Sequence, residues 1–184
     1  MTEKNYVTIK CRLVSNPHKA KMNDDRKKVG RTCTLAIEPG EETKLDALTA
    51  NVYAATTWDP KLKHKFADHT KRTGDRDDMP TMGMRFINAF ITDDKQFTCY
   101  TKRDGKTVTL SAEEAQNVIY AGCYVAAIVR PYAVTKNNPC MTAAVDGLLF
   151  WKHGERMSGA ADPNEAFEDF EDVEEDELAD ALLD

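Results

Sequence analysis

The sequence predicts a mainly β fold, a small antiparallel barrel of five strands with inserted helices, followed by an acidic tail. Segments in which apolar and polar residues alternate recur between residues 6 and 152, and they outnumber the segments with helical spacing. Successive strands are joined by short turns or by one helix, which suits a small barrel. A β-sandwich would show more strands, and alternating β and α units would show continuous apolar strands.

The first two strands are expected at residues 6–14 and 31–37. In the first strand, the apolar side chains of Val7, Ile9, Cys11 and Leu13 alternate with those of Tyr6, Thr8, Lys10 and Arg12. This alternation predicts a half-buried strand whose exposed face is basic and carries one aromatic ring. Residues 16–30 are polar and lack periodicity, so a long and mostly basic loop is expected there.

Two helices are expected after the second strand, which Pro39-Gly40 ends. Apolar residues at helical spacing predict a helix over 42–55. Asp59 before a proline is typical of a helix N-terminus and predicts a second helix over 60–71. An irregular loop is expected over 73–83.

The middle of the chain predicts a hairpin of two strands. Residues 84–92 and 96–101 are rich in β-formers and flank Asp93-Asp94. Phe86 and Phe90 share one face of the first of these strands, and they are expected in the core.

A second hairpin and a short helix are expected next. Asp104-Gly105 is a strong hairpin-turn signal. Ser111 and Glu114 form a capping box that opens a short helix, and Gly122 is expected at its C-terminal cap.

Two long strands, over 123–134 and 141–152, complete the pattern. The sum of about five main strands, two or three helices and long polar loops predicts an OB-fold-like barrel. We expect residues 1–158 to form this domain. Residues 159–184 are low in complexity, acidic and poor in β-formers, so they are expected to form a disordered C-terminal tail.

Charge is divided unequally along the chain. Residues 162–184 hold twelve acids and no Lys or Arg, which leaves 25 basic and 19 acidic residues, a net +6, before them. A cationic body tied to an anionic tail indicates a polyanion binder whose tail can compete with the polyanion. Apolar residues such as Phe167 and Phe170 interrupt the acids, and they could dock on a partner.

Several other classes of protein find little support in the sequence. The five cysteines make no CxxC and the four histidines no HExxH, so we expect a reduced protein with free buried thiols, no zinc and no cofactor. No apolar run approaches the ~20 residues of a membrane span, and residues 1–10 lack a signal-peptide core.

Enzymatic activity is not expected either. There is no P-loop and no GxSxG motif. Three acidic pairs, Asp24-Asp25, Asp77-Asp78 and Asp93-Asp94, could hold Mg²⁺ for a nuclease. All three fall in expected loops, where aspartate is common for backbone reasons.

Basic residues interleaved with aromatic ones indicate a site for single-stranded nucleic acid. Cations follow the phosphates and rings stack on bases, each stacked base contributing roughly 1–3 kcal/mol. The candidate DNA-binding residues are Tyr6, Lys10, Arg12, Lys27, Lys28, Arg31, Trp58, Lys61, Lys63, Lys65, Tyr124, Arg130 and Tyr132.

The segment 120–159 resembles the C-terminal half of a family of phage-encoded single-stranded DNA-binding proteins. The matching elements are the strand containing GCYV and RPYA (Gly122–Val125 and Arg130–Ala133), the Gly154–Arg156 motif, Ser158-Gly159 and the acidic tail. Tyr124, Arg130 and Tyr132 are the candidates that this resemblance supports. Residues 16–30 and 58–83 match no family pattern, so candidates there depend on charge and aromatic content alone.

The resemblance implies an OB-fold that coats and protects single-stranded DNA, independently of its sequence, during phage replication or recombination. It also implies a tail that recruits replication or recombination proteins, and a location in the cytoplasm of an infected bacterial cell. Three alternatives stay open: an RNA- or duplex-binding module, an adaptor acting mainly through its tail, and a Mg²⁺-dependent nuclease. Oligomeric state, including a homo-oligomer on DNA, is also open at this point.

Overall fold

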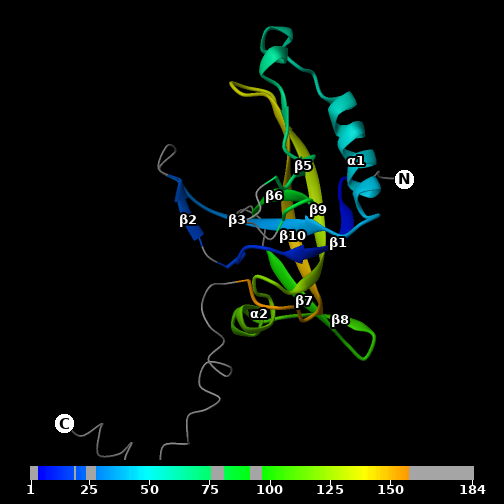
Figure 1. The fold of residues 1–184 in the computed structure, drawn as a ribbon, viewed down its shortest axis with the longest axis vertical. Helices are drawn as coiled ribbons and strands as arrows, with labels where there is room; N and C mark the ends of the chain where they lie inside the picture. The colour runs from blue at the N-terminus through cyan, green and yellow to red at the C-terminus, as the bar shows by residue number, and fades with distance from the viewer. Residues whose placement is uncertain (1–3, 19, 24–27, 76–80, 92–96, 158–184) are drawn as a thin grey trace, which may run out of the picture.

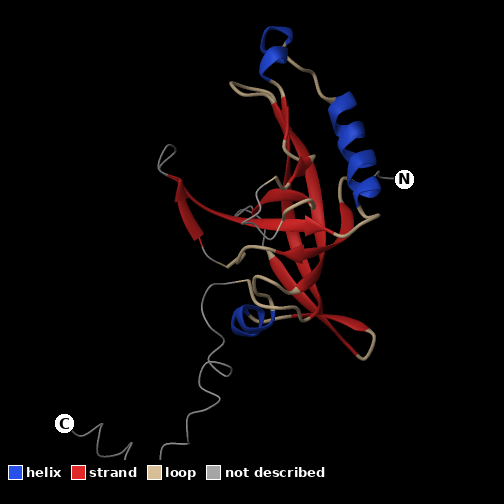
Figure 2. Ribbon diagram, viewed as in Figure 1, coloured by secondary structure: helices blue, strands red, loops and turns tan. Residues whose placement is uncertain are grey.

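Five strands of the computed structural model pair into a closed ring (Figures 1 and 2). The structure describes residues 4–18, 20–23, 28–75, 81–91 and 97–157. Side chains are not described for residues 19–29. The ring strands are β1 (Val7–Leu13), β3 (Lys28–Ile37), β6 (Arg85–Ile91), β9 (Tyr124–Val134) and β10 (Cys140–Lys152). They pair in the order β1, β3, β6, β10, β9 and back to β1.

The ring closes through one parallel junction. β6 and β10 run parallel at Phe90 and Ala144, and the other four junctions are antiparallel. The sheet is therefore mixed, as expected where a chain returns to an earlier strand through a long crossover. The predicted mainly β, OB-fold-like class with inserted helices is confirmed.

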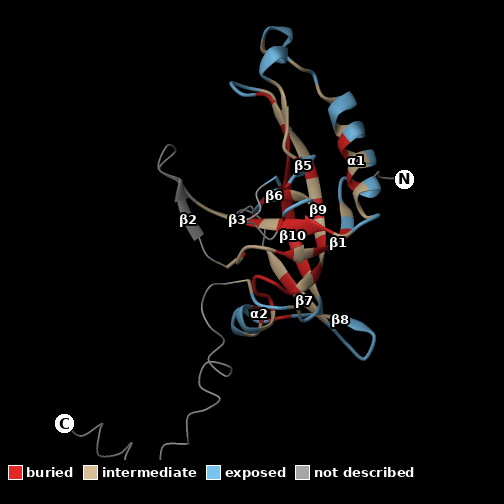
Figure 3. Ribbon diagram, viewed as in Figure 1, coloured by how far each residue is buried: buried red, intermediate tan, exposed pale blue. Residues whose placement is uncertain are grey.

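The core fills the inside of the ring, because alternate side chains of each strand point inward (Figure 3). On β1 the buried residues are Ile9, Cys11 and Leu13, and on β9 they include Val125 and Val129. β10 is buried on both faces over Met141–Val145, since it contacts other strands along most of its length.

Most of the remaining elements extend the two ends of the ring (Figure 1). At one end lie α1 (Glu42–Ala55), the 3-10 helix η1 (Pro60–Lys65) and the short strands β4 (Ala67–Asp68) and β5 (Arg72–Thr73). At the other end lie β7 (Thr98–Arg103), β8 (Lys106–Thr109) and α2 (Ala112–Val118).

Helix α1 is fastened to the ring by packing and by charge. Leu45 is fully buried in the core cluster. Asp46 pairs with Arg85 of β6 through both carboxylate oxygens, and Arg85 also donates to the carbonyl of Thr70. The Arg85 guanidinium, as hydrogen-bond donor to Asp46, lowers the pKa of that carboxyl.

Most predicted elements form as expected. The helix over 42–55, the hairpin turn at Asp104-Gly105 and the capping box of Ser111 and Glu114 are confirmed. Asp59 caps η1 by accepting a hydrogen bond from the backbone of Lys61 at 2.9 Å. The two long strands near the C-terminal end of the described chain also form where expected.

Four local predictions are wrong. The basic stretch 16–30 contains β2 (Ala20–Asn23), which pairs with an N-terminal extension of β3. The helix over 60–71 stops at Lys65, because the following residues pair as β4 with β10. Gly122 does not cap α2, whose C-cap is Ile119; instead Gly122 has φ +114° in the turn before β9.

The fourth wrong prediction concerns the middle hairpin. Within the described chain, β6 and β7 do not pair with each other, because each pairs with β10. The expected turn at Asp93-Asp94 lies outside the described residues. No helix in the described part of the chain is long and apolar enough to cross a membrane.

Candidate nucleic-acid interface

Cations and aromatic rings come together on the outer face of β1, β9 and β10. The group comprises Lys10, Arg12, Tyr124, Trp151 and Lys152, and we call it the aromatic–cation cluster. Each cation faces a ring and each ring faces at least two cations. The group holds three cations, and the acid beside it, Glu41, accepts from the Lys10 backbone and from Lys44, so the net charge of the group favours an anion.

The distances within this cluster are those of cation–π contacts. The ammonium of Lys152 lies 4.2 Å from the ring centroid of Tyr124 and 5.0 Å from that of Trp151. The ammonium of Lys10 lies 4.7 Å from the Trp151 ring, and the Arg12 guanidinium carbon lies 5.5 Å from the Tyr124 ring. The two rings meet edge to face at 6.5 Å. The cations therefore hold the rings in place while keeping their own charge exposed.

Strand register explains why these residues meet. Arg12 is opposite Tyr124, and Tyr124 is opposite Lys152. In the other direction Arg12 is opposite Ala36, which is opposite Phe86. Side chains that face each other across a ladder share one face of the sheet. Lys152, Tyr124 and Arg12 therefore share one face. Phe86 lies on the same face beyond the buried Ala36.

Trp151 joins this cluster because of a β-bulge. The register of β10 against β9 passes from Phe150 to Lys152, so Trp151 has no partner residue on β9. A bulge adds one residue to one strand and re-aims the side chains beside it. Trp151 is left 45 % exposed, next to the charge of Lys152.

A short segment after β10, residues 153–157, holds the cluster from one side. Arg12 donates to the carbonyl oxygens of Gly122 (3.1 Å) and Glu155 (3.3 Å). The backbone of Met157 donates to the carbonyl of Ala121 at 2.9 Å. Gly154 lies so close to Gly122 and to the Tyr124 ring that a Cβ there would collide with both. Close backbone approach therefore requires glycine at this position.

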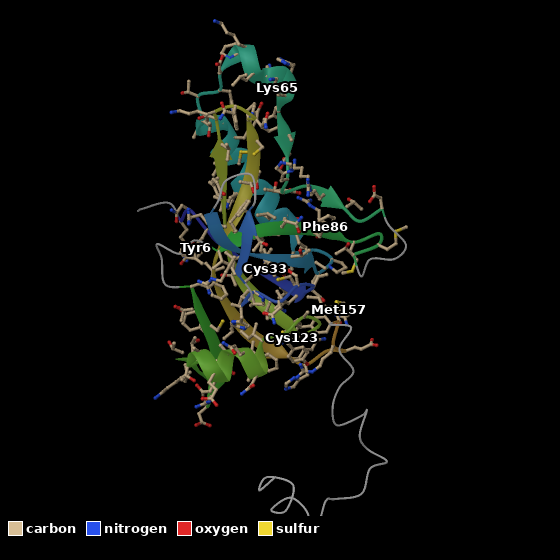
Figure 4. The ribbon with its side chains drawn as sticks, turned by 90° about the vertical axis from the view of Figure 1, so that its left-hand side faces the viewer. Tyr6, Cys33, Lys65, Phe86, Cys123 and Met157 are labelled. Atoms are coloured by element: carbon tan, nitrogen blue, oxygen red, sulfur yellow. The ribbon has the colours of Figure 1, made fainter. Side chains whose placement is uncertain are left out.

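Three predicted residues, Lys10, Arg12 and Tyr124, belong to the aromatic–cation cluster. Tyr6 lies at the start of β1 and is 39 % exposed (Figure 4). Lys27 lies outside the described residues, and Lys28 begins β3 within the stretch whose side chains are not described.

Arg130 and Tyr132 lie on the same strand as Tyr124 but further along it. Arg130 makes a two-bond ion pair with Asp146, with Nε–Oδ2 and Nη2–Oδ1 distances of 3.0 Å. This hydrogen-bonded carboxylate raises the pKa of Arg130. Asp146 is itself the extra residue of a bulge, which aims it at Arg130. Arg130 is therefore engaged within the protein. Tyr132 is half-buried opposite Thr142.

Arg31 and Cys33 are two residues apart on β3, so their side chains point to the same inner side of the sheet. Arg31 lies at the end of the core. Its guanidinium carbon is 5.5 Å from the ring of Phe97. It is thus separated from the aromatic–cation cluster, which occupies the outer face.

Trp58, Lys61, Lys63 and Lys65 lie at the far end of the molecule. Figure 4 shows Lys65 at one end and Cys123 and Met157 toward the other. Trp58 packs there against Tyr53 and Phe66, each with ring centroids 5.2 Å away. These four residues therefore form a second basic and aromatic region, separate from the cluster.

The outer face of β3 and β6 overturns the expectation that Phe86 and Phe90 belong to the core. Ile87, Ala89 and Ile91 are the buried residues of β6, while Phe86 is half-buried and Phe90 is 46 % exposed. Thr34 donates a hydrogen bond of 2.8 Å to Asn88 on the same face. In an OB-fold this second- and third-strand face is one that binds oligonucleotides.

Sequence reasoning did not select Trp151, Lys152, Phe86 or Phe90 as binding residues. The sequence does hold a signal for Lys152, because this lysine ends a predicted strand and follows an aromatic residue, Trp151. No sequence signal marks the bulge at Trp151, because Trp151 only ends the apolar run that begins at Leu148.

The cysteines of the chain are free thiols, four of them buried. Burial raises the pKa of Cys33 to about 12 and that of Cys99 to about 11, which makes both poor nucleophiles. Among the residues that the model describes, no three His, Cys, Asp or Glu side chains are grouped so as to hold a metal ion.

Rings interleaved with cations on the outside of a small β ring are typical of one class of protein, the OB-like folds that hold single-stranded nucleic acid. A family model described as Enterobacter phage Enc34, ssDNA-binding protein, matches residues 10–179. The chain belongs to this family of phage single-stranded DNA-binding proteins, which confirms the predicted resemblance. A comparison with curated proteins gives no match.

Solved structures of the bacteriophage Enc34 single-stranded DNA-binding protein share the fold. The form in complex with ssDNA has a TM-score of 0.64 and 20 % identity, covering 85 % of this chain and 91 % of that one. A form with a C-terminal truncation has a TM-score of 0.62 and 20 % identity, covering 84 % and 89 %. At this identity the likeness concerns the fold, and the binding residues have to be argued from this chain.

Proposed function

We propose that the protein binds single-stranded DNA without sequence preference, through the aromatic–cation cluster. The observation that carries the proposal is the contact of two rings with three cations on one exposed face. Lys10, Arg12 and Lys152 contact backbone phosphates, and Trp151 and Tyr124 stack on bases. Every base has a π-face, so this contact tolerates any sequence. No catalytic step is needed.

The acidic tail, in this proposal, competes with DNA for the cluster. Residues 153–157 are hydrogen-bonded beside Arg12 and Ala121, so the tail starts next to the binding face. The first tail acid, Asp162, follows Met157 by five residues, a reach of at most about 18 Å. DNA that displaces the acids would leave the tail available to replication or recombination proteins. We place this role in phage DNA replication or recombination, in the cytoplasm of the infected bacterium.

Two single-tryptophan variants test where DNA binds, because the chain holds only Trp58 and Trp151. Trp58→Phe leaves Trp151 as the sole indole, and Trp151→Phe leaves Trp58. Oligo-dT is expected to quench the fluorescence of Trp151 in the first variant and to leave that of Trp58 nearly unchanged in the second. Quenching of Trp58 alone would place the DNA on the far end of the molecule and contradict the proposed site.

Affinity measurements complete this test. Trp151→Ala removes one stacked base, and is expected to weaken oligo-dT binding by a factor of about 5 to 150. Phe90→Ala, in the same titration, shows whether the face of β3 and β6 contributes. Competition with RNA and duplex DNA separates the remaining nucleic-acid alternatives, since tighter binding of either would exclude a preference for single-stranded DNA.

Removal of residues 162–184 tests the competition. The shortened protein is expected to bind oligo-dT more tightly than the full chain at low salt, with the difference shrinking as salt screens the tail. Equal affinity of the two proteins at low salt would exclude competition.

A further inference from the structure

We propose that the pocket formed by Tyr53, Trp58 and Phe66 binds the Phe167–Phe170 segment of the acidic tail of a second copy of this chain. The proposal rests on the proposed function in one respect, which is that DNA on the aromatic–cation cluster frees the tail. Neighbouring copies on one DNA strand would then be joined tail to pocket.

The ring pocket, as we call it, is preformed. Its three rings pack mutually, with centroids 5.2 to 5.3 Å apart and two of the three contacts edge to face. The indole N–H of Trp58 donates to the carbonyl of Tyr53 at 3.1 Å, which fixes the indole. Pro60 and Pro139 complete the apolar lining. A side chain that enters such a pocket loses freedom, but the pocket itself does not have to reorganise.

The size of the ring pocket suits an aromatic side chain. Its cavity volume is about 250 Å³. A cavity of roughly 150 Å³ with apolar walls is enough to hold benzene. One phenylalanine ring can therefore enter the pocket. A nucleotide could insert only its base, and its sugar and phosphate would stay outside.

The three rings of the ring pocket line a concave cavity instead of standing on an open strand face, which argues against base stacking here. Trp58 meets Phe66 at an interplanar angle of 83° and Tyr53 meets Phe66 at 74°. Single-strand binders present flat ring faces to successive bases. The mutual packing instead builds a concave receptor for one apolar group.

The rim of the ring pocket is basic. Lys61, Lys63 and Lys65 are exposed on η1, and Lys63 lines the pocket. Asp59 lines it as well, but its carboxylate caps the same helix by accepting from the backbone of Lys61. The tail segment has the complementary order of groups, Phe167, Glu168, Asp169 and Phe170. An aromatic anchor beside two carboxylates matches an apolar pocket beside lysines, the arrangement that sets specificity at many peptide-binding sites.

Reach favours a second copy over the same chain. β10 has 13 residues, a length of about 40 Å, and leads from Cys140, beside the pocket residue Pro139, to Lys152, near the start of the tail. Ten residues separate Met157 from Phe167, and they span at most about 35 Å when fully extended. A chain's own Phe167 therefore falls short of its own ring pocket, and its own Phe170, thirteen positions after Met157, reaches it only if the segment is almost fully extended, at about 45 Å. The tail of a neighbour can approach from the side of the pocket without such extension.

Photo-cross-linking between two mass-labelled copies tests the docking. Full-length protein with p-benzoylphenylalanine in place of Phe167 is mixed with ¹⁵N-labelled full-length protein, with and without poly-dT, and irradiated. Cross-links are expected between unlabelled tail peptides and labelled peptides containing residues 53–66, and poly-dT should increase them. Cross-links to the ring pocket that join only peptides of the same label, with no mixed-label pairs, would mean docking within one chain. That result, or cross-links to other regions only, would overturn the proposal.

Charge reversal on the rim supplies the control. Labelled protein carrying Lys61→Glu and Lys63→Glu is expected to give roughly ten-fold fewer cross-links. The matched variant Lys102→Glu with Lys106→Glu, two exposed lysines of the β7–β8 hairpin, should behave as wild type. Glu168→Lys and Asp169→Lys in the tail should restore cross-linking to the reversed rim. An unchanged yield with the reversed rim would also overturn the proposal.

A short oligo-dT that binds one copy separates this inference from the proposed function. Measured in the Trp58→Phe background, in which Trp151 is the sole indole, its quenching of Trp151 should be the same with and without the rim substitutions. If that quenching persists while cross-linking to the ring pocket is absent, the docking fails and the DNA site stands. If quenching is lost in the rim variant alone, η1 binds DNA and the docking proposal is overturned.

Discussion

Two side chains on β10 owe their directions to bulges. Asp146 and Trp151 each occupy a position that the register against β9 skips. The first therefore meets Arg130, and the second meets Lys10 and Lys152. Simple alternation along 141–152 gives neither contact, which is why Arg130 was expected on the DNA face and Trp151 was not assigned to it.

Replacement of Gly154 by alanine tests the support of the Tyr124 ring. A Cβ at this position would lie 3.0 Å from a Tyr124 ring carbon and would collide with the backbone of Gly122. Overpacking of this kind costs about 1–3 kcal/mol. We expect Gly154→Ala to lower the urea midpoint and to weaken oligo-dT binding. Gly30→Ala is the control, because a Cβ there meets nothing within 4 Å; a loss of stability as large as that of Gly154→Ala would contradict this reasoning.

The Arg130–Asp146 pair is expected to stabilise the fold and to leave DNA binding unchanged. Both side chains are largely shielded, with exposed fractions of 21 % and 25 %. Asp146→Asn leaves the guanidinium without its charged acceptor, at a cost of about 1–3 kcal/mol in the free energy of unfolding. Urea denaturation measures this loss. Unchanged stability combined with weaker oligo-dT binding would return Arg130 to the DNA-binding residues.

His18 is expected to make stability depend on pH. Its Nε2 lies 3.1 Å from the carbonyl of Ile119, and burial lowers the pKa of His18 below its ordinary value of 6.5. Below that pH the unfolded chain takes up a proton that the folded chain does not, so the free energy of unfolding falls as pH drops from 7 toward 5.5. Burial of His69 lowers its pKa as well and adds to the effect. The pH slope of the urea midpoint should be smaller in His18→Gln; equal slopes would exclude this role.

At the scale of elements, the strands with clear alternation could be predicted from sequence and those held by pairing alone could not. β1, β9 and β10 carry apolar faces that a period of two reveals. β2 has only four residues, too few for alternation to stand out from the polar stretch around it, and its place depends on the ladder with β3. β4 ends the expected second helix for the same reason, because pairing with β10 overrides the local signal that begins at Asp59. β6 and β7 both pair with β10, which is far away in the chain. Because β6 and β7 are neighbours in sequence, a hairpin between them was predicted instead.

Strand burial also predicts the reactivity of the thiols. Cys11, Cys33, Cys99 and Cys123 are buried in or beside the ring strands, while Cys140 is half-buried at the start of β10. An aromatic disulfide reagent is expected to modify Cys140 quickly in the native protein and the other four only after unfolding. Cys140→Ser should abolish the fast phase. A fast phase of more than one thiol per chain would mean that the ring opens readily.

At the scale of the whole molecule, the binding face could be located from sequence only in part. Charge division along the chain identified a cationic body and an anionic tail, and alternation put Lys10 and Arg12 on an exposed face. Lys10 and Arg12 meet the residues of β10 because β9 pairs with both β1 and β10 in a fixed register. These strands lie far apart in sequence, and no local pattern encodes that register.

Salt dependence measures how many cations of the face meet phosphates. Contacts of Lys10, Arg12 and Lys152 with three phosphates predict a slope of log affinity against log salt of about −2, from roughly −0.7 for each phosphate on a single strand. Lys152→Gln is expected to reduce the slope by about 0.7. The slope comes from oligo-dT titrations of the protein lacking residues 162–184, so that the tail does not contribute. A slope unchanged by Lys152→Gln would remove this residue from the contact.

The pairing of β1 with β9 also affects how the chain folds during synthesis. Cys11 lies opposite Val125, 114 residues further along the chain. At a translation rate of about 5–20 residues per second, β1 waits on the order of ten seconds for this partner. Contacts of such high sequence separation slow folding, and until they form the apolar face of β1 is open to other strands. Until β9 is made, β1 can pair only with β3, and the charges of Lys10 and Arg12 are expected to disfavour pairing of its open edge with other chains.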